Sequence, residues 1–508
     1  MLASVKSYGL LGIGGFGVRV ETDISNGLPA YETVGLPDAA VKESKERVRA
    51  AIKNSGFKFP TVRVTVNLAP ADMRKEGALY DLPIALSILA ASGQLGDRPD
   101  LSGVFVGELA LDGSVRAVSG VLPMLIAAAD QGEASFYVPL DNGAEASYLP
   151  NAAVYAVPTL RALAAHVQGL EAIAPVPPSA WDTEAPAFEA DFAYIKGQQG
   201  AKRAAEIAVA GGHNLLLIGT PGSGKTMLAR SIPSIMPDLT FQESLEITKI
   251  HSVVGATRGR SVIRTRPFRA PHHGASAAAL VGGGTKAQPG EISLAHYGVL
   301  FLDELPEFGR DVLEALRQPL EDGCITISRA AYTATYPAEF VLVAAMNPCP
   351  CGNHGSRVNV CRCSAAQVAR YRGRISGPLL DRIDMQLEMP EVGYAELSDA
   401  SGGEPSSAVR ARVNAARARQ RARFADDGIL MNAQMSTSMI KRYCVPDAAS
   451  EKLLRQAFVQ WKLSARAYQR ILKVARTIAD VDGSDAVLAQ HYAEAIQYRC
   501  LDAHDRGF

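Results

Sequence analysis

A glycine-rich loop of eight residues constrains the fold of this chain more than any other feature. It matches the pattern G-x-x-x-x-G-K-[ST] and lies between an apolar run, 215–218, and a helix-type segment, 227–232. In a strand–loop–helix unit, backbone N–H groups and the helix N-terminus form a cradle for phosphate. The pattern predicts an ATP site rather than a plain glycine-rich connection. Its residues are Gly219, Thr220, Pro221, Gly222, Ser223, Gly224, Lys225 and Thr226.

A second motif supports this interpretation. The apolar run 298–302 ends in two carboxylates, Asp303 and Glu304. In P-loop ATPases such a pair holds Mg²⁺ and polarises the attacking water, while the loop lysine contacts the β- and γ-phosphates and its Thr ligates the metal. The alternative is a strand that ends in solvent. Together with Lys225 and Thr226, the pair favours an ATPase that uses Mg²⁺.

Composition excludes several classes of protein. The 508 residues predict about three domains, and the 52 basic and 52 acidic residues exclude a uniformly basic DNA-coating protein. No segment approaches the roughly 20 apolar residues that span a bilayer, and the N-terminus lacks a signal-peptide layout. We therefore expect a cytoplasmic protein with no membrane partner. The cysteine usage favours a reducing compartment.

The chain divides into three parts of the α/β class. We expect an N-terminal α/β domain over 1–170, a Pro-rich linker over 171–190, a parallel α/β ATPase core over 191–400 and a helical domain over 401–508. Within the core, strand 339–346 ends at Asn347, and the runs 324–329 and 332–336 predict a hairpin. Two arginines follow or begin helices, Arg382 and Arg466.

These motifs, with the runs 269–274 (RAPHHG) and 289–296 (PGEISLAH), resemble the YifB/ComM family of magnesium-chelatase-like AAA+ ATPases. The resemblance covers essentially the whole chain and implies a homo-hexameric ring with ATP between subunits. It implies that Glu304 is the water-polarising base and Asn347 the sensor 1 residue. Arg382 resembles an arginine finger supplied to the neighbouring subunit, and Arg466 resembles sensor 2 on a helical lid. Surface ion pairing is the alternative for both arginines.

The first domain resembles the Lon proteolytic domain, of the ribosomal S5 domain 2-like fold. Segments 75–81 and 119–124 fall where Lon carries its nucleophilic Ser and its catalytic Lys. The two positions correspond here to Leu79 and Leu122, and neither side chain is a nucleophile or a base. We therefore expect no protease activity.

Four of the seven cysteines form a C-x-C…C-x-C set, and four thiolates are a common structural Zn²⁺ shell. The polar, Gly-bearing segment between them predicts that a metal orders it, with free thiols as the alternative. The predicted ligands are Cys349, Cys351, Cys361 and Cys363.

The candidate DNA contacts are Lys286, in a Gly-rich loop, and Arg329, in the hairpin; ordinary surface loops are the alternative. A helix rich in arginine is a further candidate, although charge runs usually mark solvated faces or partner contacts. Its arginines are Arg410, Arg412, Arg417, Arg419, Arg421 and Arg423.

By resemblance to the ComM group, the leading hypothesis is a DNA helicase. It would act on single-stranded, forked or branched DNA and promote branch migration during natural transformation and homologous recombination, with recombination proteins as candidate partners. The alternatives are a protein-remodelling ATPase similar to the chelatase motor subunit, and a nucleotide-gated scaffold with little turnover.

Overall fold

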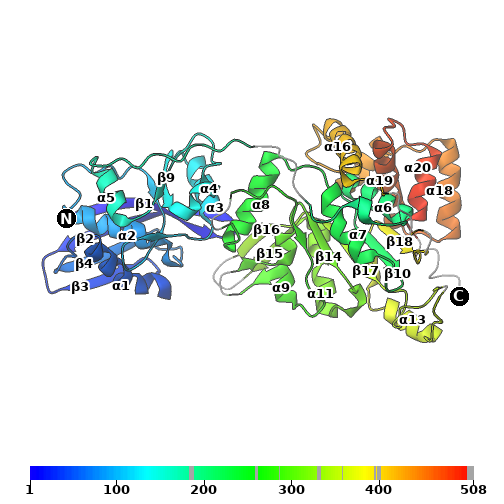
Figure 1. The fold of residues 1–508 in the computed structure, drawn as a ribbon, viewed down its shortest axis with the longest axis horizontal. Coiled ribbons are helices and arrows are strands. Elements are labelled where there is room, and N and C mark those ends of the chain that lie inside the picture. Colours follow the sequence, from blue (N-terminus) through cyan, green and yellow to red (C-terminus); the bar gives the residue numbers. More distant parts are fainter. Residues whose placement is uncertain are drawn as a thin grey trace. The chain divides into compact units, whose positions relative to one another are not determined.

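The computed structural model describes residues 1–181, 188–257, 261–284, 287–328, 333–356, 358–393, 396, 402–499 and 501. They form two compact units (Figure 1). The first comprises Met1–Glu184, Phe241–Ile263 and Ser328–Tyr336, and the second comprises Ala185–Thr240, Arg264–Ile327 and Pro337–Phe508. No helix in the described part of the chain has both the length and the apolar character needed to cross a membrane.

The first unit is built on a seven-stranded mixed sheet with the order β3-β4-β2-β1-β5-β8-β9. β1 and β4 each pair with β2 antiparallel, and β5, β8 and β9 continue the sheet in parallel from β1. Buried and more exposed residues alternate along β4, so one face of this strand packs on the core. The strands are β1 (Leu2–Leu11), β2 (Gly14–Ser25), β3 (Ala30–Val34), β4 (Arg63–Ala69), β5 (Val104–Phe105), β8 (Ser135–Pro139) and β9 (Ala153–Val157).

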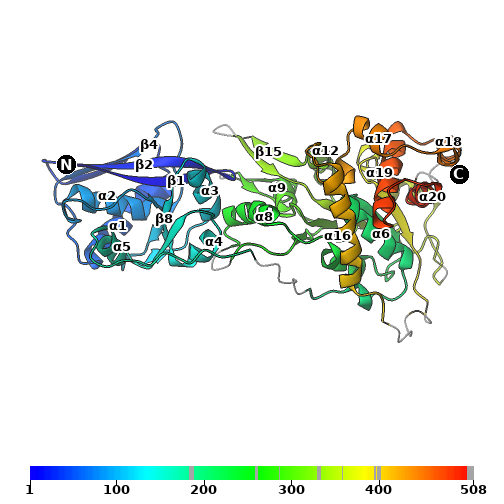
Figure 2. The same cartoon turned by 90° about the horizontal axis from the view of Figure 1, so that it is seen from above.

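Helices cover the buried face of this sheet, and Figure 2 shows α1, α2 and α5 on the same side of it. The apolar α2 contacts β1 and β2 and is buried almost throughout. A short two-stranded sheet, β6 (Glu108–Leu109) with β7 (Val115–Arg116), lies beyond the main one. The helices are α1 (Ala39–Asn54), α2 (Asp81–Ala91), α3 (Val121–Asp130), α4 (Gly143–Ala146) and α5 (Leu160–Val167).

A helix from the middle of the chain, α8 (Phe241–Val253), packs in this first unit against α3. The buried Glu145 carboxylate accepts hydrogen bonds from Ser252 and Thr257 of this segment, at 3.1 and 2.8 Å. The Gly120 N–H donates to the Ser252 carbonyl at 2.8 Å. Hydrogen bonds and helix packing therefore hold Phe241–Ile263, a segment of the predicted ATPase core, within the first unit.

The second unit contains a parallel five-stranded sheet with the order β11-β14-β17-β10-β18. The central strands are apolar and buried on both faces, as expected for a parallel sheet covered by helices. The strands are β10 (Leu215–Gly219), β11 (Phe268–Arg269), β14 (Val299–Leu302), β17 (Val341–Met346) and β18 (Met385–Met389). The helices of this part are α6 (Gln199–Gly211), α7 (Lys225–Ser231), α9 (Ala277–Val281), α10 (Glu291–Leu294), α11 (Arg310–Ala315), α12 (Arg317–Asp322), α13 (Ala365–Arg372) and α14 (Gly377–Leu380).

Two small antiparallel pairs are inserted between the core strands. β12 (Gly282–Gly283) pairs with β13 (Gln288–Pro289), and β15 (Cys324–Ser328) forms a two-stranded sheet with β16 (Thr333–Pro337), which is the expected hairpin. Their tips, with Lys286 and Arg329, lie outside the described residues.

The C-terminal part of the second unit is helical, and the views in Figures 1 and 2 show α16 and α19 beside α6. α19 has a strongly one-sided apolar face that packs against α20 and α16. The α/β fold class is thus confirmed, with a mixed-sheet N-terminal part, a parallel core and helices at the end. These helices are α16 (Ser406–Arg423), α17 (Thr437–Tyr443), α18 (Ala448–Gln460), α19 (Ala465–Val481) and α20 (Ala489–Gln497).

Candidate nucleotide site

The phosphate loop leaves β10 at Gly219 and enters α7 at Lys225, as the motif predicts. Gly222 and Gly224 have φ angles of 82° and 91°, which L-residues with a side chain rarely adopt. An added Cβ at either glycine would meet nothing within 4 Å, so backbone conformation and not space requires glycine there. The loop therefore has the strand end, the glycine turn and the helix start from which a phosphate cradle is built.

The Lys225 side chain is buried and folded into the loop. Its Nζ donates to the carbonyls of Gly219 and Thr220 at 2.7 and 3.0 Å, and it lies 3.3 Å from Asn347 Oδ1. Burial lowers the pKa of Lys225, while Asp303 and Glu304 oppose the shift. The loop lysine, the predicted sensor residue and the carboxylate pair therefore meet at one place.

The carboxyl ends of β10, β17 and β14 bring the predicted magnesium ligands together. The Thr226 hydroxyl donates to Asp303 Oδ2 at 2.8 Å, and Asp303 Oδ1 accepts the Glu304 N–H at 2.9 Å. A hydroxyl and a carboxylate are hard oxygen ligands of the kind that Mg²⁺ accepts. The donor set at Thr226 and Asp303 thus fits the ion that a P-loop site requires.

Glu304 has an unusual backbone and an unanticipated partner. Its φ and ψ of 53° and 46° are left-handed, a conformation that costs a non-glycine residue about 1–3 kcal/mol. His273 Nδ1 lies 3.4 Å from Glu304 Oε2. The sequence contained the RAPHHG run but gave His273 no role. A strained backbone at Glu304 and an imidazole beside its carboxylate are expected where the orientation of a side chain is important for function.

The four cysteines meet, although they come from two short segments. The Sγ atoms of Cys349 and Cys351 are 3.4 Å apart, and Cys361 Sγ lies 3.8 and 3.7 Å from them. With Cys363, the four sulfur atoms all lie within 4.8 Å of one another. A tetrahedron with Zn–S bonds of about 2.3 Å has sulfur atoms about 3.8 Å apart. The thiol geometry therefore fits a Cys₄ zinc shell.

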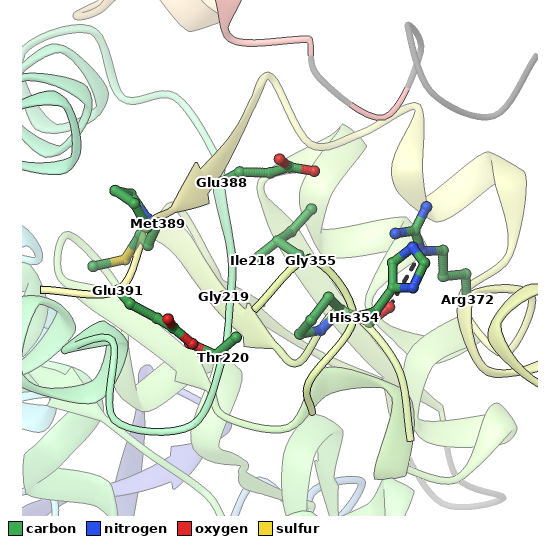
Figure 3. Close-up of a pocket in the computed structure, with 11 residues that line it drawn as sticks. Ile218, Gly219, Thr220, His354, Gly355, Arg372, Glu388, Met389 and Glu391 are labelled. Carbon is green, nitrogen blue, oxygen red and sulfur yellow. Dashed lines mark hydrogen bonds between the residues drawn. The ribbon is translucent and has the colours of Figure 1, made fainter. Parts of the chain in front are cut away.

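The cysteine segment lies directly on the phosphate loop. An added Cβ at Gly352, where φ is 79°, would come within 2.8 Å of the Pro221 ring. Beside this contact is a cavity of about 480 Å³, lined by Gly219, Thr220, His354 and Arg372 among others (Figure 3). The arrangement links the cysteine cluster to the nucleotide loop by packing.

Arg382 and Arg466 do not lie at Lys225. They line a separate cavity of about 580 Å³, and none of the phosphate-loop residues lines it. Arg382 Nη1 donates to the Pro378 carbonyl at 2.7 Å, and its guanidinium pairs with Glu321. The structure thus brings the two arginines together but places them away from the loop of the same chain.

A buried network fixes the backbone of Arg382. Arg470, on α19, pairs with Asp384 and donates to the Arg382 carbonyl at 3.2 Å. Burial alone would raise the pKa of Asp384, but the charge of Arg470 lowers it overall. Burial lowers the pKa of His213 to about 4, so this imidazole is neutral at pH 7. Because these residues are far apart in the sequence, no local pattern indicated the network.

The arginine-rich helix α16 uses most of its arginines within the chain. Arg412 pairs with Glu206 and Glu404, Arg423 pairs with Asp480, and the buried Arg417 donates to the Val209 carbonyl. Arg410 and Arg419 lie near Asp238 and Asp485, at 3.6 and 3.4 Å. The finding favours intramolecular pairing over a nucleic-acid face on this helix.

The positions compared with the Lon dyad are packed as apolar residues. Leu122 is fully buried at the start of α3 and belongs to the same apolar cluster as Leu245 of α8, and Leu79 is half-buried. The neighbouring Lys75 is buried and donates to the carbonyls of Pro70 and Met73. Neither leucine supplies the groups that peptide hydrolysis needs, so the absence of protease activity stays a prediction with a structural reason.

Three family models match the chain in consecutive segments. The model described as magnesium chelatase, subunit ChlI, matches 191–397. The model for subunit ChlI of Mg-chelatase matches 20–142, and the model for the ChlI C-terminal part matches 403–499.

Similar proteins extend over nearly the whole chain. The uncharacterized proteins YifB of Salmonella typhimurium and of Escherichia coli are each 46% identical over 99% of this chain and 97% of their own length. The competence protein ComM of Haemophilus influenzae is 45% identical over 98% of both chains. These relatives are similar to the chain in all three of the segments that the models match.

Proposed function

Because the chain belongs to the YifB/ComM family of magnesium-chelatase-like AAA+ ATPases, we propose that it is a hexameric, ATP-driven DNA helicase that promotes branch migration. Its DNA substrate would be single-stranded, forked or branched, as in the integration of DNA during transformation and homologous recombination. The name of the Haemophilus influenzae relative, a competence protein, supports the choice of DNA as the substrate. Recombination proteins are candidate partners for this activity.

One observation supports the ring above the others. Lys225, Thr226 and Asp303 lie at one site, whereas Arg382 and Arg466 line another cavity of the same chain. Neither of these two arginines lines the cavity beside the phosphate loop of its own chain, where Arg372 does, and an arginine that stabilises the transition state can be supplied in trans. We infer that both arginines reach the nucleotide of the adjacent subunit. A closed ring satisfies this need at every interface.

The chemistry follows from the positions of the side chains. Lys225 and the loop N–H groups bind the β- and γ-phosphates, and Thr226 and Asp303 would hold Mg²⁺, which neutralises phosphate charge when bound. Glu304 then orients and polarises water, with its direction set by the strained backbone and by His273. Asn347, 3.3 Å from Lys225 Nζ, would contact the γ-phosphate side of the site.

The first prediction concerns stimulation by DNA. We expect steady-state ATP hydrolysis of the purified protein to rise with single-stranded DNA and most with forked DNA, because unwinding consumes ATP. The measurement compares these two with no DNA, and Lys225→Ala serves as the blank because it removes the phosphate contact. ATP hydrolysis that no DNA changes would favour the protein-remodelling function that the chelatase family models suggest.

A second prediction concerns the cysteine cluster, which we propose binds zinc. The purified protein should contain about one Zn²⁺ per chain, because four thiolates complete a structural shell. Cys351→Ser and Cys361→Ser should each lose that zinc in native mass spectrometry, while Cys324→Ser, outside the cluster, should keep it. A metal-free wild-type protein purified without chelators would exclude the site. ATPase activity is a separate readout, since Gly352 packs on the phosphate loop.

A further inference from the structure

The predicted arginine finger is neutralised within its own chain. The guanidinium of Arg382 pairs with Glu321 of α12, and the two side chains are 7% and 51% exposed. The Arg382 Nε is buried without a hydrogen-bond partner in the described part of the chain. Arg382 is therefore enclosed, while its carboxylate partner remains open to the cavity that both residues line.

The position of Glu321 in its own helix does not favour a negative charge. It is the next-to-last residue of α12, and a carboxylate at a helix C-terminus faces the negative end of the dipole. Its hydrogen bond with Arg382 and the charges of Arg466 and Arg317 lower the pKa of Glu321. The largest of these effects comes from Arg382, which lines the cavity together with Arg466 and would itself bind an incoming anion.

An arginine stabilises the charge of a transferring phosphoryl group only when its own charge is not already paired. We propose that Glu321 is a displaceable counter-ion, which holds Arg382 paired until charge develops on the transferring phosphoryl group of ATP in a neighbouring subunit. This inference rests on the proposed function, because it assumes that Arg382 acts across a subunit interface. Glu321 is then a positioning residue that sets the rate of hydrolysis without touching ATP.

The same residue is linked to the hairpin. α12 ends at Asp322, and after Gly323, with φ of 63°, the chain enters β15 at Cys324. The Ala338 N–H, directly after β16, donates to the Gly323 carbonyl at 2.7 Å and closes the base of the hairpin. A force on the hairpin therefore reaches Glu321 through only two residues. DNA bound there would shift Glu321 away from Arg382 and so raise ATP hydrolysis.

The test is Glu321→Gln in the full-length protein. We expect kcat without DNA to rise about two- to fivefold, the range that one partly exposed ion pair allows, with KM for ATP unchanged. The rate with forked DNA should stay near that of the wild type, so the stimulation by DNA falls by the same factor. Glu451→Gln is the matched control, because this exposed acid pairs with Arg455 at 3.9 Å on α18, outside the cavity.

Other outcomes would overturn the inference. A lower rate without DNA would mean that Glu321 positions Arg382 for catalysis. Unchanged rates would mean that the Arg382–Glu321 pair does not limit ATP hydrolysis. The increase must also vanish when Glu321→Gln is combined with Arg382→Ala. If Glu321→Gln unfolds, Glu321→Asp keeps the charge at a shorter reach and should raise the DNA-free rate as well. A wild-type protein indifferent to DNA would refute the helicase instead, while the DNA-free comparison still tests the pair.

Discussion

Replacing Arg382 with alanine is expected to lower kcat for ATP hydrolysis by about 10³-fold or more, the effect typical of a lost arginine finger. ATP binding should persist, because Lys225 and the phosphate loop, which bind the nucleotide in the proposed mechanism, are unchanged. Arg455→Ala, which removes an exposed arginine of α18, is the control and should change the rate little. Nucleotide affinity measured by equilibrium binding separates lost chemistry from lost binding.

Mixing variants tests whether Arg382 acts across an interface. Arg382→Ala keeps its own Lys225 site, and Lys225→Ala keeps its own arginine. In mixed rings, some interfaces combine the intact site of one with the intact arginine of the other, so partial recovery of ATP hydrolysis is expected. If mixtures are as inactive as either variant alone, the arginine does not act in trans in the way proposed here.

Glu304→Gln is expected to lower ATP hydrolysis by about 10²- to 10⁴-fold, the usual contribution of a general base. The amide keeps the size of the side chain and the contact with His273 but no longer polarises water. Because Lys225, Thr226 and Asp303 are untouched, the variant should bind ATP and hold the assembled ring. The measurements are single-turnover hydrolysis and the mass of the complex with ATP.

Glu307→Gln provides a control three residues away. Glu307 is also an exposed acid beside the site, but it pairs with Arg374 at 2.7 Å and has no place in the proposed chemistry. It should retain most of the activity. Nearly normal turnover in Glu304→Gln would move the role of base to another group and leave the strained backbone of Glu304 without a catalytic reason.

The sequence predicted domains that follow one another along the chain, but the compact units of the structure combine segments that are far apart in the sequence. The boundaries at residues 170, 190 and 400 stay a prediction. The first compact unit also contains Phe241–Ile263 and Ser328–Tyr336, which come from the region assigned to the ATPase core. The hydrogen bond between Ser252 and Glu145, and the apolar cluster that contains Leu122 and Leu245, bring together residues more than a hundred positions apart. Periodicity and composition are local, so they contain no signal for such contacts.

The sequence by itself determined the parts of the site that one short segment encodes. The phosphate loop needs glycine at fixed positions, and apolar runs that end in carboxylates or an amide predict buried strands with polar ends. The parallel sheet then places Lys225, Asp303 and Asn347 together, because carboxyl ends of neighbouring strands share an edge.

Only the tertiary structure decided how the charged groups pair. In the structure, Glu304 lies beside His273, Arg382 pairs with Glu321, and most arginines of α16 pair with acids of the same chain. An exposed charge has many possible partners at similar energies, and the sequence ranks none of them. Packing of the helical part against the core fixes the distances between these groups, and the distances determine which arginine is paired and which is buried.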